Sequence, residues 1–312
     1  SGFGGWRYMF ALAMIPSAVL VAAMWRMPDS PRWLMSRGAS EKARDVLRRI
    51  RGTQDVDAEM ARMQKSLERQ SGGAEDLFHP TLRMALLVGL GLAIFQQITG
   101  INTVIYYSPT ILQFAGFKTA GFSILATVGV GMINVLFTIV AIRLLDRVGR
   151  RPLLLIGVAG QVVGLAILGI AFQLHQLANV IGYVAVGSLA IYIGSFAIGL
   201  GPAFWLLISE IYPQKVRGAA MSIATVANWA LNLIVALTFL SLVQALGRPG
   251  TFWLYGVIGI VAWIFIYRMV PETKGRSLEE IESHWRAGRH PREMERAGVS
   301  TAGEGRQAGG GE

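Results

Sequence analysis

Long apolar stretches alternate with short polar segments along most of the chain. Seven of these stretches are long enough to cross a lipid bilayer, which takes ~20 helical residues. Several contain glycine or proline, which membrane-embedded helices tolerate when neighbouring helices satisfy the freed backbone groups. Helices buried in a soluble protein are the alternative, but seven such stretches in succession argue against it. The pattern therefore predicts an all-α membrane protein. The predicted spans are Tyr8–Met27, Met84–Thr110, Gly121–Leu145, Pro152–Leu174, Val180–Ile208, Gly218–Leu246 and Thr251–Val270.

The segment between the first two spans has an amphipathic pattern of its own. A helix that Ser40 caps and that runs to about Arg51 would gather its apolar residues on one face, with Gly52 just past its end. A second helix over about 55–70 would do the same. These faces favour a small helical domain on the cytoplasmic side over a solvated connector. The apolar positions are Ala43, Val46, Leu47 and Ile50, then Val56, Met60, Met63 and Leu67.

The chain divides into four parts on this pattern. Residues 1–27 form one span, 28–83 the cytoplasmic helical domain, 84–270 a six-helix bundle and 271–312 a cytoplasmic tail. After about residue 286 the tail is rich in Gly, Arg and Glu and has no apolar period, so we expect it to be disordered.

Two similar segments suggest an internal repeat. Residues 28–32 (PDSPR) close the first span, and residues 271–276 (PETKGR) close the seventh. Similar segments six helices apart are what two tandem six-helix halves would give. We therefore expect a chain cut from a larger protein, with only the last helix of the first half present.

Composition agrees with a membrane protein. Hydrophobic residues make up 53% of the 312 residues and charged residues 15%, with a mean hydropathy of +0.47. Soluble domains carry roughly 25% charged residues. The absence of cysteine excludes disulfide frameworks, cysteine-ligated zinc and thiol nucleophiles.

The net charge of +10 reflects topology. All but three of the 29 Lys and Arg residues lie in alternate inter-span segments or at the span ends beside them; the exceptions are Arg7, Lys118 and Arg248. The positive-inside rule places the larger set in the cytoplasm. We therefore expect a multi-pass protein of the cell membrane, with the N-terminus of the chain outside, its C-terminus in the cytoplasm, and no nucleic-acid partner.

Uncharged polar residues gather near the middle of the second span. Residues 96–103 read QQITGINT, and Gly100 weakens the helix there. Unpaired polar groups are costly in a span, so each is a functional candidate. Amides both donate and accept hydrogen bonds, which suits a neutral hydroxylated ligand. Amides that only join helices are the alternative. The candidates here are Gln96, Gln97 and Asn102.

Three further spans carry candidates for the same cavity. Asn134 lies in the middle of the third span, Trp205 follows a Gly–Pro interruption of the fifth, and the sixth carries Asn228, Trp229 and Asn232. An aromatic ring beside amides is a common sugar arrangement, because the ring packs on C–H groups while the amides bind hydroxyls. Core packing explains any single one of them equally well. For the whole set we expect a shared polar cavity.

Two cytoplasmic turns combine acids with arginines. Residues 146–151 read DRVGRR, and Glu210 and Arg217 bracket the next turn. Opposite charges at a membrane face can latch helices in one conformational state. Plain positive-inside anchoring is the alternative. It accounts well for Arg150 and Arg151, but not for the two acids.

An intramembrane enzyme is the least favoured class. It would need a nucleophile–base pair or metal ligands at membrane depth. All four histidines lie in loops, span ends or the tail, and no acid lies in the middle of a span. We therefore expect no catalytic residue, no metal and no cofactor.

Together these motifs resemble the signatures of the sugar porter family of the major facilitator superfamily, in that family's order and at fitting spacings. The resemblance runs from about Gly5 to Trp285, and the set is far more specific than any one motif. The motifs are PDSPRWL (28–34), QQITGIN (96–102), DRVGRR (146–151), Gly201-Pro202 with Trp205, the turn from Glu210 to Arg217, and PETKGR (271–276).

The resemblance implies a transporter of twelve helices in two six-helix bundles, with a helical domain between helices six and seven. This chain would hold helices six to twelve and would lack most of the N-terminal bundle. Residues 196–199 read FAIG where several animal members carry Glu, which resembles bacterial members more closely.

The resemblance also implies residue roles. Sugar contacts would come from Gln96, Gln97, Asn102, Asn134 and Trp205, with Asn228 at a position where many members have Gln or Asn, and Trp229 after it. Tyr106 and Tyr107 would belong to the extracellular gate. The cytoplasmic charge network would comprise Asp146, Arg147, Arg151, Glu210 and Arg217.

The leading hypothesis is alternating-access transport of a sugar, either a monosaccharide or a polyol, across a bacterial inner membrane. The expected partners are the sugar, membrane lipid and the missing N-terminal bundle. A proton-coupled parent would carry its coupling carboxylate outside this chain, because no span here has a central acid; in the bacterial members that it resembles, the carboxylate is an Asp in the first helix. The alternatives are a sugar sensor, which the short featureless tail disfavours, and an inactive fragment.

Overall fold

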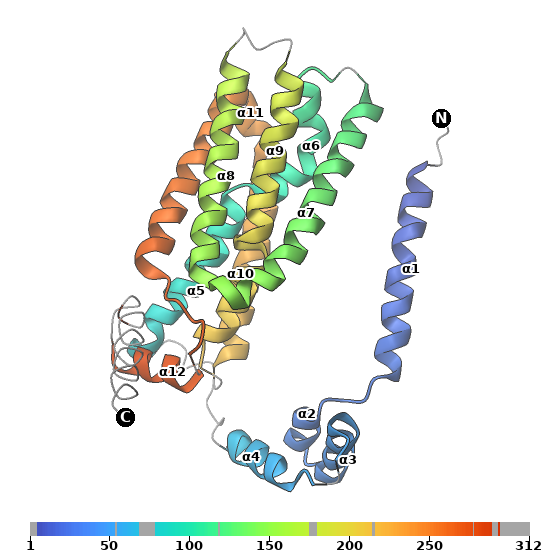
Figure 1. Ribbon diagram of the computed structural model, residues 1–312, viewed down its shortest axis with the longest axis vertical. Helices are drawn as coiled ribbons and strands as arrows, with labels where there is room; N and C mark the ends of the chain where they lie inside the picture. Colours follow the sequence, from blue (N-terminus) through green and yellow to red (C-terminus); the bar gives the residue numbers. More distant parts are fainter. Residues whose placement is uncertain are drawn as a thin grey trace, which may run out of the picture. The chain divides into compact units, whose positions relative to one another are not determined.

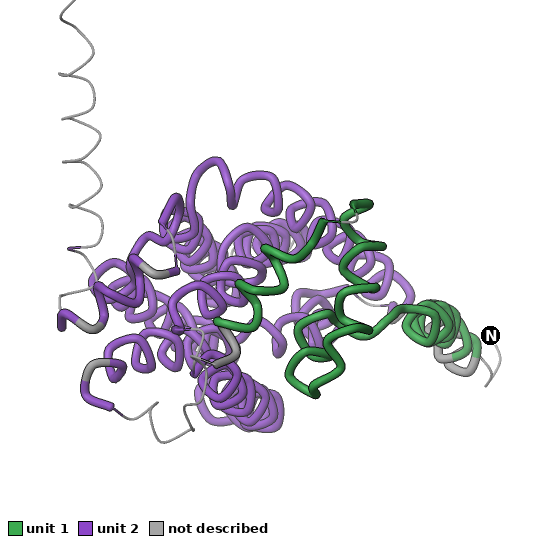
Figure 2. The backbone as a smooth tube through the Cα atoms, turned by 90° about the horizontal axis from the view of Figure 1, so that it is seen from below, with its two compact units in different colours: residues 1–71 green, residues 72–312 purple. Residues whose placement is uncertain are grey.

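The computed structural model describes residues 5–53, 55–68, 79–117, 119–174, 180–213, 216–276, 278–288 and 293. Its regular structure within these residues is helical (Figure 1), as the sequence predicted. The chain divides into two compact units, residues 1–71 and 72–312 (Figure 2). The tail that we expected to be disordered falls almost entirely outside the described residues.

The first unit contains one long apolar helix and three short ones. Helix α1 (Gly5–Arg26) corresponds to the first predicted span and contains Pro16. Helices α2 (Pro31–Ser36), α3 (Ser40–Arg51) and α4 (Asp57–Glu68) follow it. Their small apolar core consists of Leu34, Met35, Ala43, Leu47, Val56 and Met60.

The start and end of α3 show how the local sequence sets its bounds. Gly52 ends the helix in the left-handed conformation (φ 67°), which glycine adopts without a steric penalty. Ala39, not Ser40, is the N-cap residue. Ile50, expected on the packed face, is 63% exposed, whereas Ala43 and Leu47 of the same helix are buried in the core.

The second unit contains the remaining helices. Among the residues that the structure describes, five segments have the length and hydropathy of a membrane span, the last of them 53 residues long. The elements are η2 (Pro80–Leu82), α5 (Arg83–Ile98), α6 (Ile101–Phe114), α7 (Ala120–Val148), α8 (Arg150–Gln173), α9 (Ile181–Ile198), α10 (Leu200–Ile211), α11 (Arg217–Met269) and α12 (Leu278–Arg286).

Helix α11 is a hairpin of two spans. Gly247 has non-helical angles (φ 72°, ψ 170°). Arg217 at its start donates to the Tyr212 carbonyl, and Tyr267 near its end accepts from Arg151. Arg248 at the bend instead reaches Phe114, at the far end of α6. Both ends of α11 therefore lie at one end of the bundle, so its arms match the sixth and seventh predicted spans.

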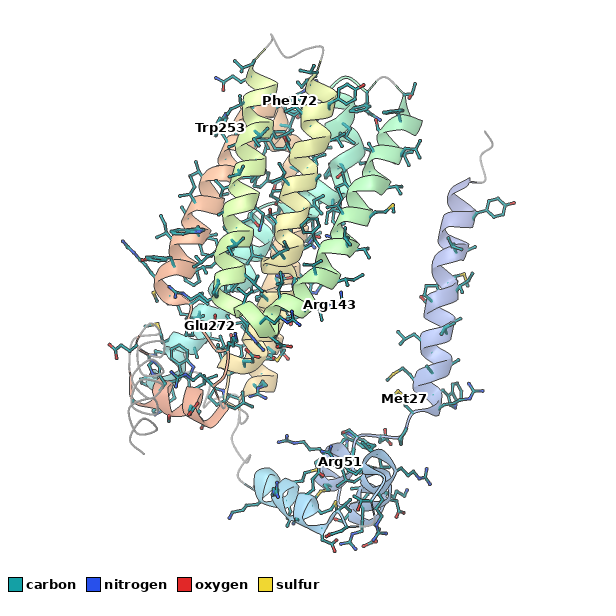
Figure 3. All side chains as sticks on the ribbon, viewed as in Figure 1. Met27, Arg51, Arg143, Phe172, Trp253 and Glu272 are labelled. Carbon is teal, nitrogen blue, oxygen red and sulfur yellow. The ribbon has the colours of Figure 1, made fainter. Side chains whose placement is uncertain are left out.

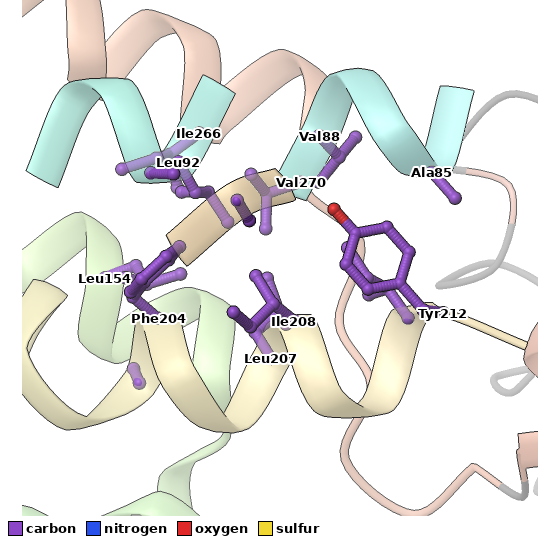
Figure 4. Packing of buried hydrophobic residues seen from close by; sticks show 14 of the residues in the cluster. Ala85, Val88, Leu92, Leu154, Phe204, Leu207, Ile208, Tyr212, Ile266 and Val270 are labelled. Atoms are coloured by element: carbon purple, nitrogen blue, oxygen red, sulfur yellow. The ribbon is translucent and has the colours of Figure 1, made fainter. Parts of the chain in front are cut away.

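Two helix breaks divide the apolar core of this unit. The path from α5 to α6 breaks at Gly100, and the path from α9 to α10 breaks at Gly199. One buried cluster, partly drawn in Figure 4, includes Leu92 before the first break and Phe204 after the second. The other cluster includes Ile101 after the first break and Ile193 before the second. Both breaks therefore lie where the two clusters meet.

Candidate functional site

Gly100 opens the backbone between α5 and α6. Its φ of +91° lies in the left-handed region, where side chains are disfavoured. A Cβ atom there would also lie 3.1 Å from the Tyr255 ring. The break ends α5 at Ile98 and starts α6 at Ile101. Gln97 and Asn102 consequently lie on either side of it.

Four of the predicted amides form one hydrogen-bonded network. Asn102 Nδ2 donates to Gln97 Oε1 at 2.8 Å, and Gln97 Nε2 donates to Asn228 Oδ1 at 2.9 Å. Asn228 Nδ2 donates to Gln96 Oε1 at 2.6 Å and to the Ala93 carbonyl at 3.1 Å. Gln96 Nε2 donates to the Leu200 carbonyl at 2.9 Å. We name these four side chains the amide network; they connect α5, α6, α11 and the start of α10.

Burial differs along the amide network. Gln96, Gln97 and Asn228 are 3%, 5% and 2% exposed, whereas Asn102 is half-buried. Buried amides must be hydrogen-bonded, because each unpaired polar group costs about 1–3 kcal/mol. The network meets this demand without any charged side chain.

The other four predicted site residues do not join the amide network through a hydrogen bond within the described residues. Trp205, on α10, is 39% exposed and packs edge-on against Phe204 at 4.7 Å. Trp229 follows Asn228 on α11 and is 60% exposed, and Asn232, one turn on, is 7% exposed. Asn134 on α7 is half-buried. The structure thus brings four of the eight candidates into direct contact.

The two tyrosines of α6 differ from each other. The Tyr107 hydroxyl donates to the Ala236 carbonyl at 3.4 Å, and its ring lies 4.9 Å from Phe239, so it packs on α11. Tyr106 is 55% exposed. Of the two predicted gate residues, Tyr106 is therefore the more accessible.

Arg143 and Glu272 lie at the end of the bundle that is opposite Phe172 and Trp253 (Figure 3). Arg150 is central there, with its side chain only 11% exposed. Its Nη2 and Nε donate to the two carboxylate oxygens of Glu210 at 2.9 and 3.2 Å, and its Nη1 donates to the Leu145 carbonyl at 2.9 Å. Asp146 adds a second carboxylate at 3.4 Å from Nη2. We name this set the charged cluster.

Glu272 adds a backbone component. Its two carboxylate oxygens accept the N–H groups of Arg150 and Arg151, each at 3.1 Å. These N–H groups belong to the first turn of α8, where a helix lacks internal acceptors and a carboxylate is favoured. Gly149 leaves the necessary space, since a Cβ atom there would lie 2.5 Å from Glu272 Oε2. The Thr273 hydroxyl also donates to Glu210 at 2.6 Å.

The remaining arginines predicted for this end make other contacts. Arg151 is 7% exposed and donates to the Tyr267 carbonyl at 2.9 Å. Arg217 donates to the Tyr212 carbonyl at 3.0 and 3.1 Å. The Arg147 side chain is exposed, and its carbonyl accepts a hydrogen bond from Lys274.

Sequence reasoning missed three residues of this end. Arg150 was explained as a membrane anchor, but its near-complete burial against Glu210 shows that it is an ion-pair partner. Glu272 and Thr273 were noted only as part of a repeated segment. The available signal was an acid and a hydroxyl directly after the last span, at the level where the first turn of α8 leaves its N–H groups open.

Helix α12 also lies at this end, and the sequence did not predict it. Trp285 is 1% exposed and donates to the Ile211 carbonyl at 3.1 Å. The adjacent Tyr212 is 1% exposed, and burial raises the pKa of its hydroxyl. Within the described residues, no group of His and acidic residues could hold a metal ion.

Comparison with known proteins identifies relatives of this chain. Residues 2–285 match the family model "Sugar (and other) transporter". The putative metabolite transport protein YwtG of Bacillus subtilis (strain 168) is 42% identical over 281 residues, which cover 90% of this chain and 61% of that protein. The D-xylose-proton symporter of Escherichia coli (strain K12) is 39% identical over 289 residues, covering 90% and 57%.

A solved structure is similar in sequence and fold. The proton:xylose symporter XylE bound to 6-bromo-6-deoxy-D-glucose is 39% identical, with a TM-score of 0.75 over 90% of this chain and 59% of that one. The chain therefore spans about three fifths of the length of the relatives that it matches.

Proposed function

The chain belongs to the sugar porter family of the major facilitator superfamily, and we propose that it supplies the sugar-binding bundle of a transporter that works by alternating access. The observation that supports this most directly is the amide network, which lies at both helix breaks and contains only neutral donors and acceptors. Such groups match the hydroxyls of a sugar. The remainder of the cavity would come from sequence that the relatives have beyond this chain.

The proposed substrate is a monosaccharide or a polyol. Relatives named for such substrates include a D-xylose-proton symporter, an arabinose-proton symporter and a major myo-inositol transporter. The proposed sugar site is the amide network with the candidates on neighbouring helices. Tyr106 and Tyr107, in the middle of α6, are the proposed gate residues. The site residues are Gln96, Gln97, Asn102, Asn134, Trp205, Asn228, Trp229 and Asn232.

The charged cluster is the proposed latch for the state in which the cytoplasmic side is closed. It joins the start of α8 to the end of α10 through the ion pair of Arg150 and Glu210. The other proposed members of the latch are Asp146, Arg147, Arg151 and Arg217. Opening this side requires these helices to separate, so the ion pairs stabilise one state over the other. The proposed orientation, which the positive-inside rule supports, has the C-terminus in the cytoplasm of a bacterial cell and the N-terminus of the chain outside.

Proton coupling, if the whole protein has it, would use a carboxylate outside this chain. Within the described spans no acidic residue lies at mid-depth, and Glu210 is held by Arg150 at one end. The chain on its own should therefore not accumulate sugar in response to a pH gradient. Transport rather than catalysis is the proposed activity of the whole protein.

The test is uptake of labelled D-xylose, L-arabinose, D-glucose and myo-inositol into vesicles that contain the full-length protein carrying this chain. Saturable uptake of at least one of them, absent from empty vesicles, is the expected result. Saturable binding without uptake would instead establish a sensor, and neither binding nor uptake of any sugar would overturn the proposal.

A further inference from the structure

The amide network uses its hydrogen-bonding capacity unevenly. A primary amide has two N–H donors and an oxygen with two lone pairs. Asn228 uses both N–H donors, one toward the Ala93 carbonyl and one toward Gln96 Oε1, and its oxygen accepts a hydrogen bond from Gln97. Only one lone pair remains, on a residue that is 2% exposed. A ligand could gain a donor from Asn228 only by breaking a bond that already exists.

Gln96 and Gln97 are the partners that Asn228 holds. Gln96 accepts from Asn228 and donates to the Leu200 carbonyl. Gln97 donates to Asn228 and accepts from Asn102. Each therefore has one hydrogen bond on its nitrogen and one on its oxygen, and both side chains are held in a single orientation by neighbours on other helices.

Asn102 is the open end of the amide network. Its Nδ2 donates one hydrogen bond, to Gln97. Its Oδ1 makes no recorded hydrogen bond to any part of the chain that the structure describes. Asn102 is also the one member that is half-buried instead of buried. A hydroxyl that donates to this oxygen would break no existing bond.

We propose that Asn228 is a positioning residue that fixes Gln96 and Gln97 for the sugar and does not itself bind it. This inference rests on the sugar-binding function proposed above and refines it, because resemblance alone places Asn228 among the sugar contacts. The physical reason is the cost of reorganisation. If Asn228 donated to a ligand, a buried oxygen would lose its hydrogen bond. A ligand bound at Asn102 leaves every hydrogen bond of the network intact.

The same network links the two helix breaks. It begins at the Leu200 carbonyl, directly after Gly199, and ends at Asn102, directly after Gly100 and Ile101. Asn228 is the bridge, because its side chain forms hydrogen bonds with both Gln96 and Gln97. Loss of Asn228 should therefore disturb the whole site, while loss of Asn102 should affect one ligand hydroxyl.

The first test compares sugar hydroxyls. Binding of D-xylose and its monodeoxy analogues is measured for the full-length protein and for Asn102→Ser and Asn228→Leu. Asn228→Leu should weaken every sugar by a similar factor of about 10, whereas Asn102→Ser should abolish the preference for one hydroxyl. Gln244→Leu, which changes an exposed amide on the same helix, is the matched control and should leave affinities unchanged. A loss confined to one hydroxyl in Asn228→Leu would overturn the proposal.

The second test needs no sugar. Thermal unfolding is compared for Asn228→Leu, Gln96→Leu and the double variant. If Asn228 positions Gln96, the double variant should lose clearly less stability than the sum of the single losses, because each single change strands the other amide. Additive losses would overturn the inference. Asn228→Ser, which can still donate one hydrogen bond, should fall between wild type and Asn228→Leu and replaces Asn228→Leu where that variant fails to fold.

The two tests separate this inference from the proposed function. A wild-type protein that binds no sugar would count against the function alone, and the unfolding cycle would still decide the role of Asn228. Sugar binding with additive unfolding losses would leave the function standing and remove the positioning role.

Discussion

The amide network and the charged cluster both join helices that are distant in sequence, but they do so with different physics. The network uses neutral groups that are 2–5% exposed apart from Asn102. The charged cluster uses a guanidinium that is 11% exposed and carboxylates that range from 21% to 80%. A neutral hydrogen bond contributes about 1 kcal/mol, whereas breaking a buried ion pair costs about 3–5 kcal/mol. Weak neutral hydrogen bonds therefore suit reversible binding of a ligand. A strong ion pair suits the stabilisation of one conformational state over another.

The largest effect should come from removing one charge of the central ion pair. Glu210→Gln keeps the shape but leaves Arg150 without its main partner. We expect the transport rate to fall about 30- to 100-fold, somewhat less than a fully buried pair would give, because Glu210 is partly exposed. Equilibrium sugar affinity should change less than threefold.

Asp146→Asn is the matched control for Glu210→Gln. Its side chain is 80% exposed and 3.4 Å from Arg150, so transport should change little. Vesicle uptake and equilibrium binding, measured on the same preparations, check both variants. Equal losses of binding and transport in Glu210→Gln would remove the distinction between latch and site.

Binding should be the property that responds to the amide network. Gln97→Ala or Asn102→Ala removes a hydrogen bond to a neutral group, about 1–2 kcal/mol, and should weaken sugar affinity by roughly 5- to 30-fold. Expression should stay normal. Equilibrium binding by the full-length protein checks this, and unchanged affinity in both variants would reduce the network to helix packing.

The sequence predicted the candidate site best where a residue type is unusual for its surroundings. Amides in the middle of an apolar span stand out, and so the members of the network could be predicted from position and residue type alone. Their pairing could not be, because it depends on how α11 lies against α5. A weak point in the helix at Gly100 could be predicted, because the tolerance of glycine for a positive φ, here +91°, depends on the residue itself and not on distant packing.

The charged end was harder to predict because its residues are alike. Arg147, Arg150 and Arg151 lie within five residues, and nothing local distinguishes an anchor from an ion-pair partner. Helix packing decides which arginine forms the ion pair, since it brings Arg150 against Glu210. Helix α12 was not predicted for a related reason. Its large apolar residues Leu278, Ile281 and Trp285 lie in a polar segment, and Ile281 and Trp285 become part of a core only through packing against distant helices such as α10.

A smaller effect should follow from the backbone part of the charged cluster. Glu272→Gln keeps the size of the side chain but removes the charge that stabilises the first turn of α8. Loss of a helix cap costs about 1 kcal/mol, so we expect unfolding about 2–4 °C lower and transport a few-fold slower. Differential scanning calorimetry and uptake measure these changes. An unchanged melting temperature would show that the α8 N–H groups find other acceptors.

The smallest effect should come from Arg147, although it lies in the same turn as Arg150. Resemblance places Arg147 in the charge network, but its side chain is exposed, and its recorded contact is made by its carbonyl, to Lys274. An exposed charge contributes about 0–1 kcal/mol at most. Arg147→Ala should therefore change transport less than about twofold, whereas Arg150→Ala should reproduce the loss in Glu210→Gln. Uptake by the two variants, side by side, checks this. A large loss in Arg147→Ala with normal binding would mean that Arg147 forms its ion pair in the other conformational state, and the latch would then involve more residues than Arg150 and its carboxylates.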